Sequence, residues 1–227
     1  MRRTIWTMML VVLALFLFLG ESAAQDDRRD KYDGESLYAA VEQAVFYVRA
    51  FRSDGTLKDV GSGFVIRPDG TALTAYHVVE EADKVECVLS DASVVSCHTI
   101  TENSTADTAV LKLSPSIDAS GTESPFPFIR LRTNALKHGE NIFAVGYPMK
   151  DTPIITEGIV NAPRAPINGR DRILVSSQLV SGMSGGPLLD SFGYAAGILS
   201  GSLRAMNGIH LAVDSQAVQQ VLEQDGH

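Results

Sequence analysis

The sequence lacks the features that mark several large classes of protein. Lysine and arginine number 19 against 27 aspartate and glutamate residues, and the formal net charge is −8. An acidic surface argues against nucleic acid or anionic lipid as a partner. There is no glycine-rich phosphate loop or basic stripe, and His98, His138 and His227 do not lie at spacings typical of metal ligands. We therefore expect no nucleotide, nucleic-acid or metal chemistry and no cofactor.

Long apolar runs are absent beyond the N-terminus. The single run, residues 8–19, follows two arginines and precedes the small residues at positions 22–24. This order is typical of a secretory signal peptide. The run is also shorter than the roughly 20 residues that a membrane span needs. We expect cleavage after Ala24, no stable membrane insertion afterwards, and export to a periplasmic or secreted location. The alternative is an uncleaved membrane anchor at residues 1–24.

The rest of the chain has the composition of one all-β domain. Residues 25–35 are dense in charges of both signs and are expected to form a flexible lead-in. Residues 36–227 are enough for a single barrel or sandwich domain. Short apolar runs separated by turn residues recur along them at a spacing that suits β-barrels. We see no internal repeat and no second domain.

The expected elements follow from these runs. A helix is expected at residues 37–45, followed by a strand that ends at Phe51. Residues 114–127 and 162–171 are rich in Pro, Gly and Ser and are expected to be loops. A closing helix is expected at residues 216–222, capped by Asp214 or Ser215. Further strands are expected at residues 61–66, 71–79, 85–89, 94–99, 109–113, 142–145, 154–160, 173–178, 186–189, 195–199 and 209–213.

The sequence has two cysteines, Cys87 and Cys97. Export would place them where disulfides persist. They flank a turn at residues 91–93, and if this turn centres on Ala92 the two cysteines face each other directly across a hairpin. The sequence therefore predicts a disulfide, with two reduced, packed thiols as the alternative.

The strongest chemical signal is the segment SGMSGGP at residues 181–187. A nucleophilic serine needs a tight turn that exposes its hydroxyl, and glycines on both sides of Ser184 permit that turn. The N–H groups of Gly182 and Ser184 would then hold a developing oxyanion. In isolation, the alternative is an ordinary glycine-rich loop.

Two polar residues beside apolar strands complete a candidate triad. Alone, a histidine such as His77 is more often a core residue than a base, and an aspartate such as Asp107 is ordinarily a turn former. With Ser184 they occur in the order His, Asp, Ser, at separations of 30 and 77 residues. This is the order of the chymotrypsin triad.

Four segments resemble the motifs of the trypsin-like serine proteases, in particular the bacterial Htr or Deg-type branch. They are GSGF at 61–64, TAYHVV at 74–79, DTAVLK at 107–112 and GMSGGP at 182–187. The similarity covers nearly all of residues 36–213. It implies an all-β fold of two six-stranded β-barrels, with the active site between them, in addition to the short C-terminal helix.

The resemblance also implies roles. Ser184 would attack the scissile carbonyl, His77 would carry the proton to the leaving amine, and Asp107 would orient the imidazole. The implied function is a serine endopeptidase that cleaves proteins or peptides through an acyl-enzyme. The alternative is a catalytically latent or inactive module that acts as a binding or scaffold protein. Such modules usually lose a triad residue or a flanking glycine, and neither is missing here.

The family's pattern also points to a specificity pocket. It implies a small or medium apolar residue before the cleaved bond. The implied lining is Leu179, Ser202 and Leu203, with Ser200 and Gly201 nearby on the strand that pairs with substrate.

The chain departs from the family's pattern at several positions. His210 would lie near the pocket wall, where it would favour an acidic residue; the alternative is that it faces solvent or the helix. Met183 precedes the nucleophile where the family usually has asparagine, and residues 175–178 carry no acidic residue. PDZ domains commonly follow the protease in this branch, and we expect none here. The sequence assigns no oligomeric state.

Overall fold

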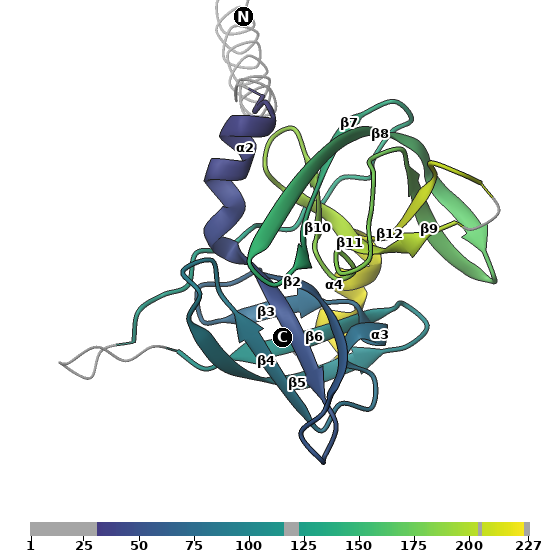
Figure 1. Cartoon of the computed structure of the whole chain (residues 1–227). Coiled ribbons are helices and arrows are strands. Elements are labelled where there is room, and N and C mark those ends of the chain that lie inside the picture. Colours follow the sequence, from purple (N-terminus) through teal and green to yellow (C-terminus); the bar gives the residue numbers. More distant parts are fainter. Residues whose placement is uncertain (1–30, 116–122, 204–205, 225–227) are drawn as a thin grey trace, which may run out of the picture. The chain divides into compact units, whose positions relative to one another are not determined.

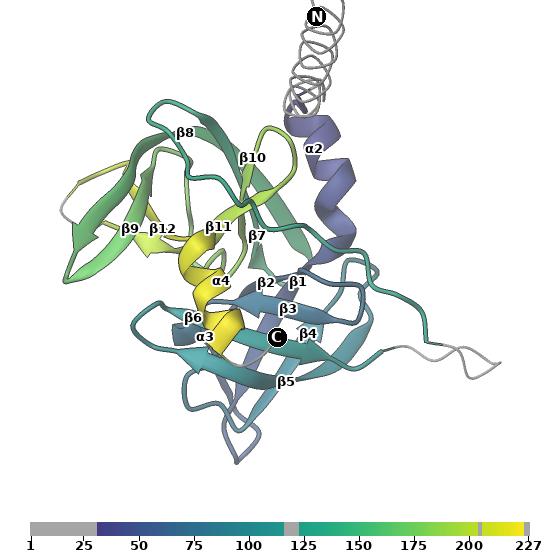
Figure 2. The same ribbon diagram turned by 180° about the vertical axis from the view of Figure 1, so that it is seen from behind.

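Two closed barrels, each of six antiparallel strands, make up most of the fold (Figures 1 and 2). The structure is a computed structural model that describes residues 31–115, 123–203 and 206–224. Both barrels lie in one compact unit, Tyr32–His227. The predicted all-β fold of two six-stranded barrels is therefore confirmed.

The strands divide evenly between the two halves of the chain. The first barrel contains β1 (Val45–Phe51), β2 (Leu57–Val65), β3 (Thr71–Thr74), β4 (Lys84–Val88), β5 (Val94–Asn103) and β6 (Thr108–Leu113). The second contains β7 (Asn141–Met149), β8 (Thr152–Ile167), β9 (Arg170–Val175), β10 (Pro187–Asp190), β11 (Ala195–Ser202) and β12 (His210–Asp214). Their orders around the barrels are β1-β2-β3-β6-β5-β4 and β10-β11-β12-β9-β8-β7.

Strand β7 shows how the second barrel packs on both of its faces. Ile142 and Ala144 belong to the apolar cluster inside this barrel. Phe143 and Val145 belong to the cluster that also fills the first barrel. Successive side chains of a strand point to opposite faces, so one strand contributes to both cores. The apolar core therefore continues from one barrel to the other.

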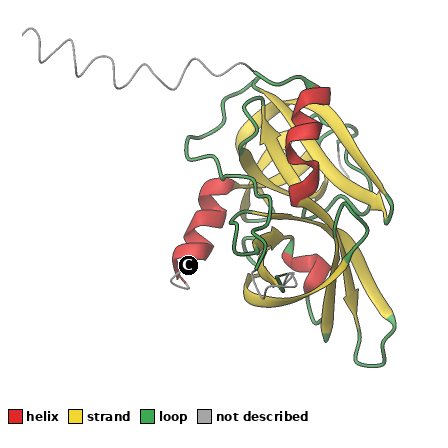
Figure 3. Cartoon of the chain, turned by 90° about the vertical axis from the view of Figure 1, so that its left-hand side faces the viewer, coloured by secondary structure: helices red, strands yellow, loops and turns green. Residues whose placement is uncertain are grey.

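Helices flank the barrels at the two ends of the described chain (Figure 3). The expected helix at 37–45 begins earlier, as α2 (Gly34–Val41), because the Asp33 carboxylate accepts the free N–H of Ser36 at 2.8 Å. A short 3₁₀ turn, η2 (Glu42–Ala44), then leads into β1. At the other end, α4 (Ser215–Gln224) packs against β5 and β6 as well as β11 and β12. It thus contacts both barrels (Figure 2).

The expected strand at 71–79 is wrong in its second half. The pairing of β3 with β2 and β6 stops at Thr74, and the one-turn helix α3 (Tyr76–Val79) follows. Val78 and Val79 suggested a strand because β-branched residues favour one. Their burial in the core overrides that preference. The candidate base, His77, therefore lies on a helix.

The expected loop at 162–171 is also wrong. Strand β8 continues to Ile167 and β9 begins at Arg170, so the segment is a β-hairpin. Its turn is Asn168-Gly169, both with positive φ (51° and 75°). Such two-residue turns match the twist of the paired strands. The two prolines in this segment had suggested a loop.

The disulfide between Cys87 and Cys97 is present, but the predicted register is off by two residues. Cys87 pairs with Val95, and Cys97 pairs with Val85. The Asp91 carboxylate accepts the N–H of Ser93 at 2.9 Å, which centres the turn one position earlier than expected. The disulfide thus joins diagonal neighbours, whose Cα atoms are 6.3 Å apart.

Several expectations concern residues outside those described. The signal peptide at 1–24, residues 25–30 of the lead-in and residues 116–122 of the loop at 114–127 are among them. Within the described part of the chain, no helix combines the length and apolarity needed to cross a bilayer.

Replacing both Cys87 and Cys97 by alanine should lower the free energy of unfolding by about 3 kcal/mol, because the disulfide closes a short loop in the unfolded chain. Urea unfolding of the oxidised protein and of the double variant measures the difference. Reduced wild type is the control and should match the variant. Equal unfolding midpoints for oxidised and reduced wild type would contradict this stabilising role.

Candidate active site

The first half of the candidate site is a direct contact between His77 and Asp107. The ring Nδ1 of His77 lies 2.9 and 3.1 Å from the two carboxylate oxygens of Asp107. The backbone N–H of His77 also donates to Asp107 at 3.2 Å. These contacts fix the ring's orientation and leave its Nε2 edge for other chemistry. The His77 side chain remains 41% exposed, against 9% for Asp107.

Asp107 occupies a constrained position at the end of the β5–β6 turn. Its φ is +53°, a left-handed value that is uncommon outside glycine, although aspartate tolerates it better than most residues. In the same turn, the Asn103 side chain accepts the N–H of Ala106 at 2.8 Å. The hydroxyl of Ser200, on β11 of the second barrel, also donates to the Asp107 carboxylate. Asp107 is therefore held by groups from both barrels.

The hydrogen bonds of this cluster shift the pKa values of its members in opposite directions. Burial raises the pKa of Asp107, but the bonds from His77 and Ser200 outweigh burial and hold that pKa below its ordinary value. The bond to Asp107 raises the pKa of His77 above its ordinary value, although burial opposes this. The pair therefore favours an ionised carboxylate beside an imidazole that accepts a proton readily.

The second half of the candidate site is the turn that carries Ser184. Gly182 and Gly185 have φ values of +93° and +90°. A Cβ on Gly185 would lie 2.1 Å from the carbonyl oxygen of Ser62, and one on Gly182 would lie 2.8 Å from that of Tyr147. Only glycine fits these two positions.

Within the described residues, the N–H groups of Gly182 and Ser184 form no hydrogen bond. By contrast, the N–H of Met183 donates to Val180, and that of Gly185 donates to Leu199. Two donors on one tight turn thus remain free for a ligand.

The structure brings the Ser184 turn beside the helix that carries His77. A Cβ on Gly61 would meet both the Val78 side chain, at 2.7 Å, and the Ser184 carbonyl oxygen, at 2.9 Å. Val78 is the neighbour of His77 on α3. Among the described residues, the Ser184 hydroxyl forms no hydrogen bond, so the arrangement lacks a direct bond from Ser184 to the His77 ring.

Ser62 is a structural residue of the site that the sequence analysis missed. Its hydroxyl donates to the carbonyl of Gly182 and accepts the N–H of Tyr147, both at 2.8 Å. Its own N–H donates to the carbonyl of Ser184 at 2.8 Å. The position of Ser62 between two glycines of the GSGF motif was the available signal. Ser200 was expected on the strand that pairs with substrate, near the specificity pocket, and its bond to Asp107 was not foreseen.

Of the expected specificity residues, Ser202 contacts His210. His210 is only 6% exposed, so of the alternative that it faces solvent or the helix, the first part is wrong. Its Nδ1 lies 2.8 Å from the hydroxyl of Ser202, and its Nε2 is buried without a partner. Burial lowers the pKa of His210 and favours the neutral ring. Leu179 is likewise buried, and Leu203 is half-buried.

Gly201 and two of the histidines that the sequence analysis excluded as metal ligands lie outside the contact between Ser202 and His210. Gly201 lies at a bulge of β11, with a φ of +139°. His98 and His138 are exposed. In the part of the chain that the structure describes, no group of three or more His, Cys, Asp or Glu side chains is arranged to hold a metal ion.

Residues 61–198 match the family model of the trypsin-like peptidase domain. A "Probable periplasmic serine endoprotease DegP-like" of Ectopseudomonas mendocina is 32% identical over 174 residues, which are 74% of this chain and 35% of that protein. A protein of the same name from Pseudomonas savastanoi pv. phaseolicola is 35% identical over 63% of this chain and 29% of its own length. A "Putative serine protease HhoB" of Synechocystis is 30% identical over 76% of this chain and 40% of its own. The chain thus spans about a third of the length of these curated relatives.

A solved structure has the same fold. The crystal structure of the serine endoprotease from Yersinia pestis superposes with a TM-score of 0.71, covering 87% of this chain and 68% of that one at 22% identity. The family model covers more than half of this chain, and the sequence relatives agree with it. The chain therefore belongs to the family of trypsin-like peptidase domains.

Proposed function

We propose that this chain is a serine endopeptidase that hydrolyses peptide bonds in proteins through an acyl-enzyme. The observation that carries the proposal is the contact of His77 with both carboxylate oxygens of Asp107, beside a turn that only glycines on both sides of Ser184 allow. In this proposal Ser184 is the nucleophile, His77 is the general base and Asp107 is the orienting group.

The proposed chemistry follows from the protonation preferences of the pair. His77 takes the proton of the Ser184 hydroxyl as the oxygen attacks the scissile carbonyl, and later gives it to the leaving amine. The carboxylate of Asp107 stabilises the imidazolium that forms between these steps. Its lowered pKa and the raised pKa of His77 both support this role. Water then hydrolyses the acyl group on Ser184 with the same base.

The free N–H groups of Gly182 and Ser184 are the proposed oxyanion hole. A tetrahedral intermediate carries its negative charge on the former carbonyl oxygen, and donors fixed in advance stabilise that charge. Losing one such donor typically costs about 3–4 kcal/mol of transition-state stabilisation. Neither N–H group is used by the described part of the protein itself.

The proposed compartment and substrates follow from the sequence and from the relatives' names. Two of those names include the word periplasmic. With the signal-peptide pattern of residues 1–24, this supports export to the periplasm or beyond, and proteins or peptides there as substrates. The rival function, a latent or inactive binding module, is favoured only by the unbonded Ser184 hydroxyl. The presence of all three triad residues and both glycines favours the enzyme.

A fluorophosphonate probe, which reacts with activated serines, tests the triad. The purified protein should be labelled, and Ser184→Ala and His77→Ala should both abolish labelling, because one removes the nucleophile and the other its base. Intact-mass spectrometry measures the adduct, and circular dichroism checks that the variants fold. An unlabelled wild type would favour the latent module instead.

The pH dependence of labelling tests the electrostatics of the pair. The rate should rise with pH, since only neutral His77 can accept the proton, and its midpoint should lie above the roughly 6.5 of an ordinary imidazole. Asp107→Asn should move the midpoint down and slow labelling roughly 10⁴-fold. The Arg130→Gln variant, altered at an exposed residue, is the control. A midpoint that stays in place in Asp107→Asn would refute the assignment of Asp107.

We further propose that His210 and Ser202 form the polar wall of the specificity pocket, with Leu179 and Leu203 beside them. The buried, unpartnered Nε2 of His210 supports an acidic residue before the cleaved bond. His210→Gln should reduce the ratio of kcat/KM for a glutamyl over a valyl peptide about tenfold or more. The same change at exposed His138 should leave the ratio unaltered. A valyl preference in the wild type would instead support the apolar pocket.

A further inference from the structure

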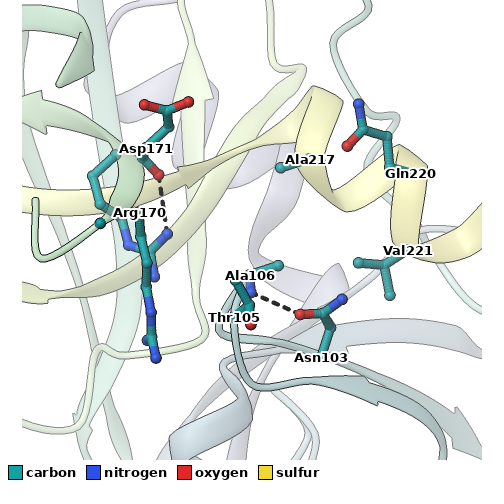
Figure 4. A pocket seen from close by; sticks show the side chains of 10 residues that line it. Asn103, Thr105, Ala106, Arg170, Asp171, Ala217, Gln220 and Val221 are labelled. Atoms are coloured by element: carbon teal, nitrogen blue, oxygen red, sulfur yellow. Dashed lines mark hydrogen bonds between the residues drawn. The ribbon is translucent and has the colours of Figure 1, made fainter. Parts of the chain in front are cut away.

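A cavity of about 280 Å³ opens between the β5–β6 turn, the β8–β9 hairpin and α4 (Figure 4). Its lining is rich in hydrogen-bond donors, which come from all three elements. Arg170 and Arg172 contribute guanidinium groups, Asn103 and Gln220 contribute amides, and Thr105 contributes a hydroxyl. A second cavity of about 340 Å³ adjoins it and shares both arginines.

Arg172 is the unusual member of this lining. The residue is only 7% exposed, yet its guanidinium forms no salt bridge with any described residue. Its one hydrogen bond within the described chain runs from Nη1 to the carbonyl oxygen of Asp171, at 3.0 Å. A guanidinium has five N–H donors, so most of them are unused. Burial of the residue lowers the pKa of Arg172, while its unbonded guanidinium nitrogens are not among the fully buried unpartnered atoms and remain accessible from the cavities that it lines.

Arg170 adds a second positive charge without a counter-ion. It is exposed and, among the described residues, it forms neither a salt bridge nor a side-chain hydrogen bond. Its charge also contributes to lowering the pKa of Arg172. Two guanidinium groups close to each other repel, and an anion bound between or beside them would relieve that repulsion.

The carboxylates near the two arginines are already engaged. Asp171 pairs with Arg164 at 2.6 Å, and its carboxylate points away from Asn103 and Thr105 (Figure 4). Asp107, which lines the second cavity, is bonded to His77 and Ser200. Its charge raises the pKa of Arg172, but no oxygen of Asp107 lies within 4 Å of that guanidinium. No described carboxylate therefore serves as the direct counter-ion of either arginine, which leaves both available to an anion from solution.

We propose that the 280 Å³ cavity binds a phosphate group, held by the guanidinium groups of Arg170 and Arg172. A guanidinium group can donate two parallel hydrogen bonds to two oxygens of one phosphate. The Asn103 amide holds the adjoining turn, because its oxygen accepts the N–H of Ala106, and its nitrogen points toward Val221 (Figure 4). The site has room for an inorganic phosphate or a small phosphate ester.

The bound phosphate has a consequence for the active site, which rests on the proposed function. Asn103, Thr105 and Ala106 line the cavity, and Asp107 follows them in its left-handed conformation. A ligand that joins this turn to the β8–β9 hairpin stabilises the conformation in which Asp107 meets His77. Phosphate therefore acts as an activator that does not touch substrate.

Titration of the full chain with inorganic phosphate tests the site, against chloride at constant pH and ionic strength. Calorimetry and thermal unfolding should show saturable binding and a higher melting temperature. Arg172→Gln and the exposed Arg170→Gln should each weaken binding at least about tenfold, the usual effect of losing a hydrogen bond to a charged group. Arg130→Gln is the matched control and should bind as the wild type does.

The outcomes separate the site from the proposed function. Phosphate also stabilises proteins by exclusion from their surface, so an equal rise in all variants would overturn the site. Faster fluorophosphonate labelling of the wild type with phosphate would support the coupling to Asp107, and an unchanged rate would overturn it. A protein that binds phosphate but is never labelled would refute only the protease. Tighter binding of glycerol 3-phosphate than of inorganic phosphate assigns the ester as the ligand, and the reverse assigns the free ion.

Discussion

The geometry of the site depends on the hydroxyl of Ser62. This single side chain of the first barrel donates to the Gly182 carbonyl on the serine turn and accepts the N–H of Tyr147 on β7. Both partners are backbone groups in a buried junction, where an unpaired donor or acceptor costs about 1–3 kcal/mol. The backbone N–H of Ser62 also binds the carbonyl of Ser184. The serine turn therefore takes its shape from the first barrel, although it belongs to the second.

The half of the site that contains Asp107 depends in turn on the second barrel. Asp107 belongs to the first barrel, and the hydroxyl of Ser200 on the second barrel donates to its carboxylate. Each barrel thus supplies one serine hydroxyl that holds a key residue of its partner. Since the apolar core also continues between the barrels, the arrangement of the site depends on how the two barrels pack against each other. A barrel folded alone would present neither Asp107 nor Ser184 in the described arrangement.

The sequence predicts what depends on local pattern and misses what depends on contacts across the fold. Short apolar runs separated by turn residues predict an all-β barrel domain, the resemblance to the trypsin-like proteases implies that there are two barrels, and the flanking glycines predict the tight turn at Ser184. The helical conformation at His77 was missed, because the two valines that follow it favour a strand by their own preference. Their burial in the core overrides that preference. The hydrogen bonds of Ser62 and Ser200 to other parts of the site were missed, because the sequence around a serine in a strand does not show which group its hydroxyl will meet. The register of the β4–β5 hairpin was predicted wrongly, because the hydrogen bond that the Ser93 N–H donates to the Asp91 carboxylate centres the turn one residue earlier.

Met183 shows how a departure from the family's pattern is accommodated. The family usually has asparagine before the nucleophile, and here the Met183 side chain is fully buried in the core of the second barrel. Its backbone still closes the turn, donating to Val180 and accepting from Gly186. The anchor of the turn is therefore apolar packing instead of side-chain hydrogen bonding. Because packing is tolerant of small displacements whereas a hydrogen bond is directional, the precision of the turn has to come from elsewhere. The hydrogen bonds of Ser62 and the positive φ angles of Gly182 and Gly185 provide that precision.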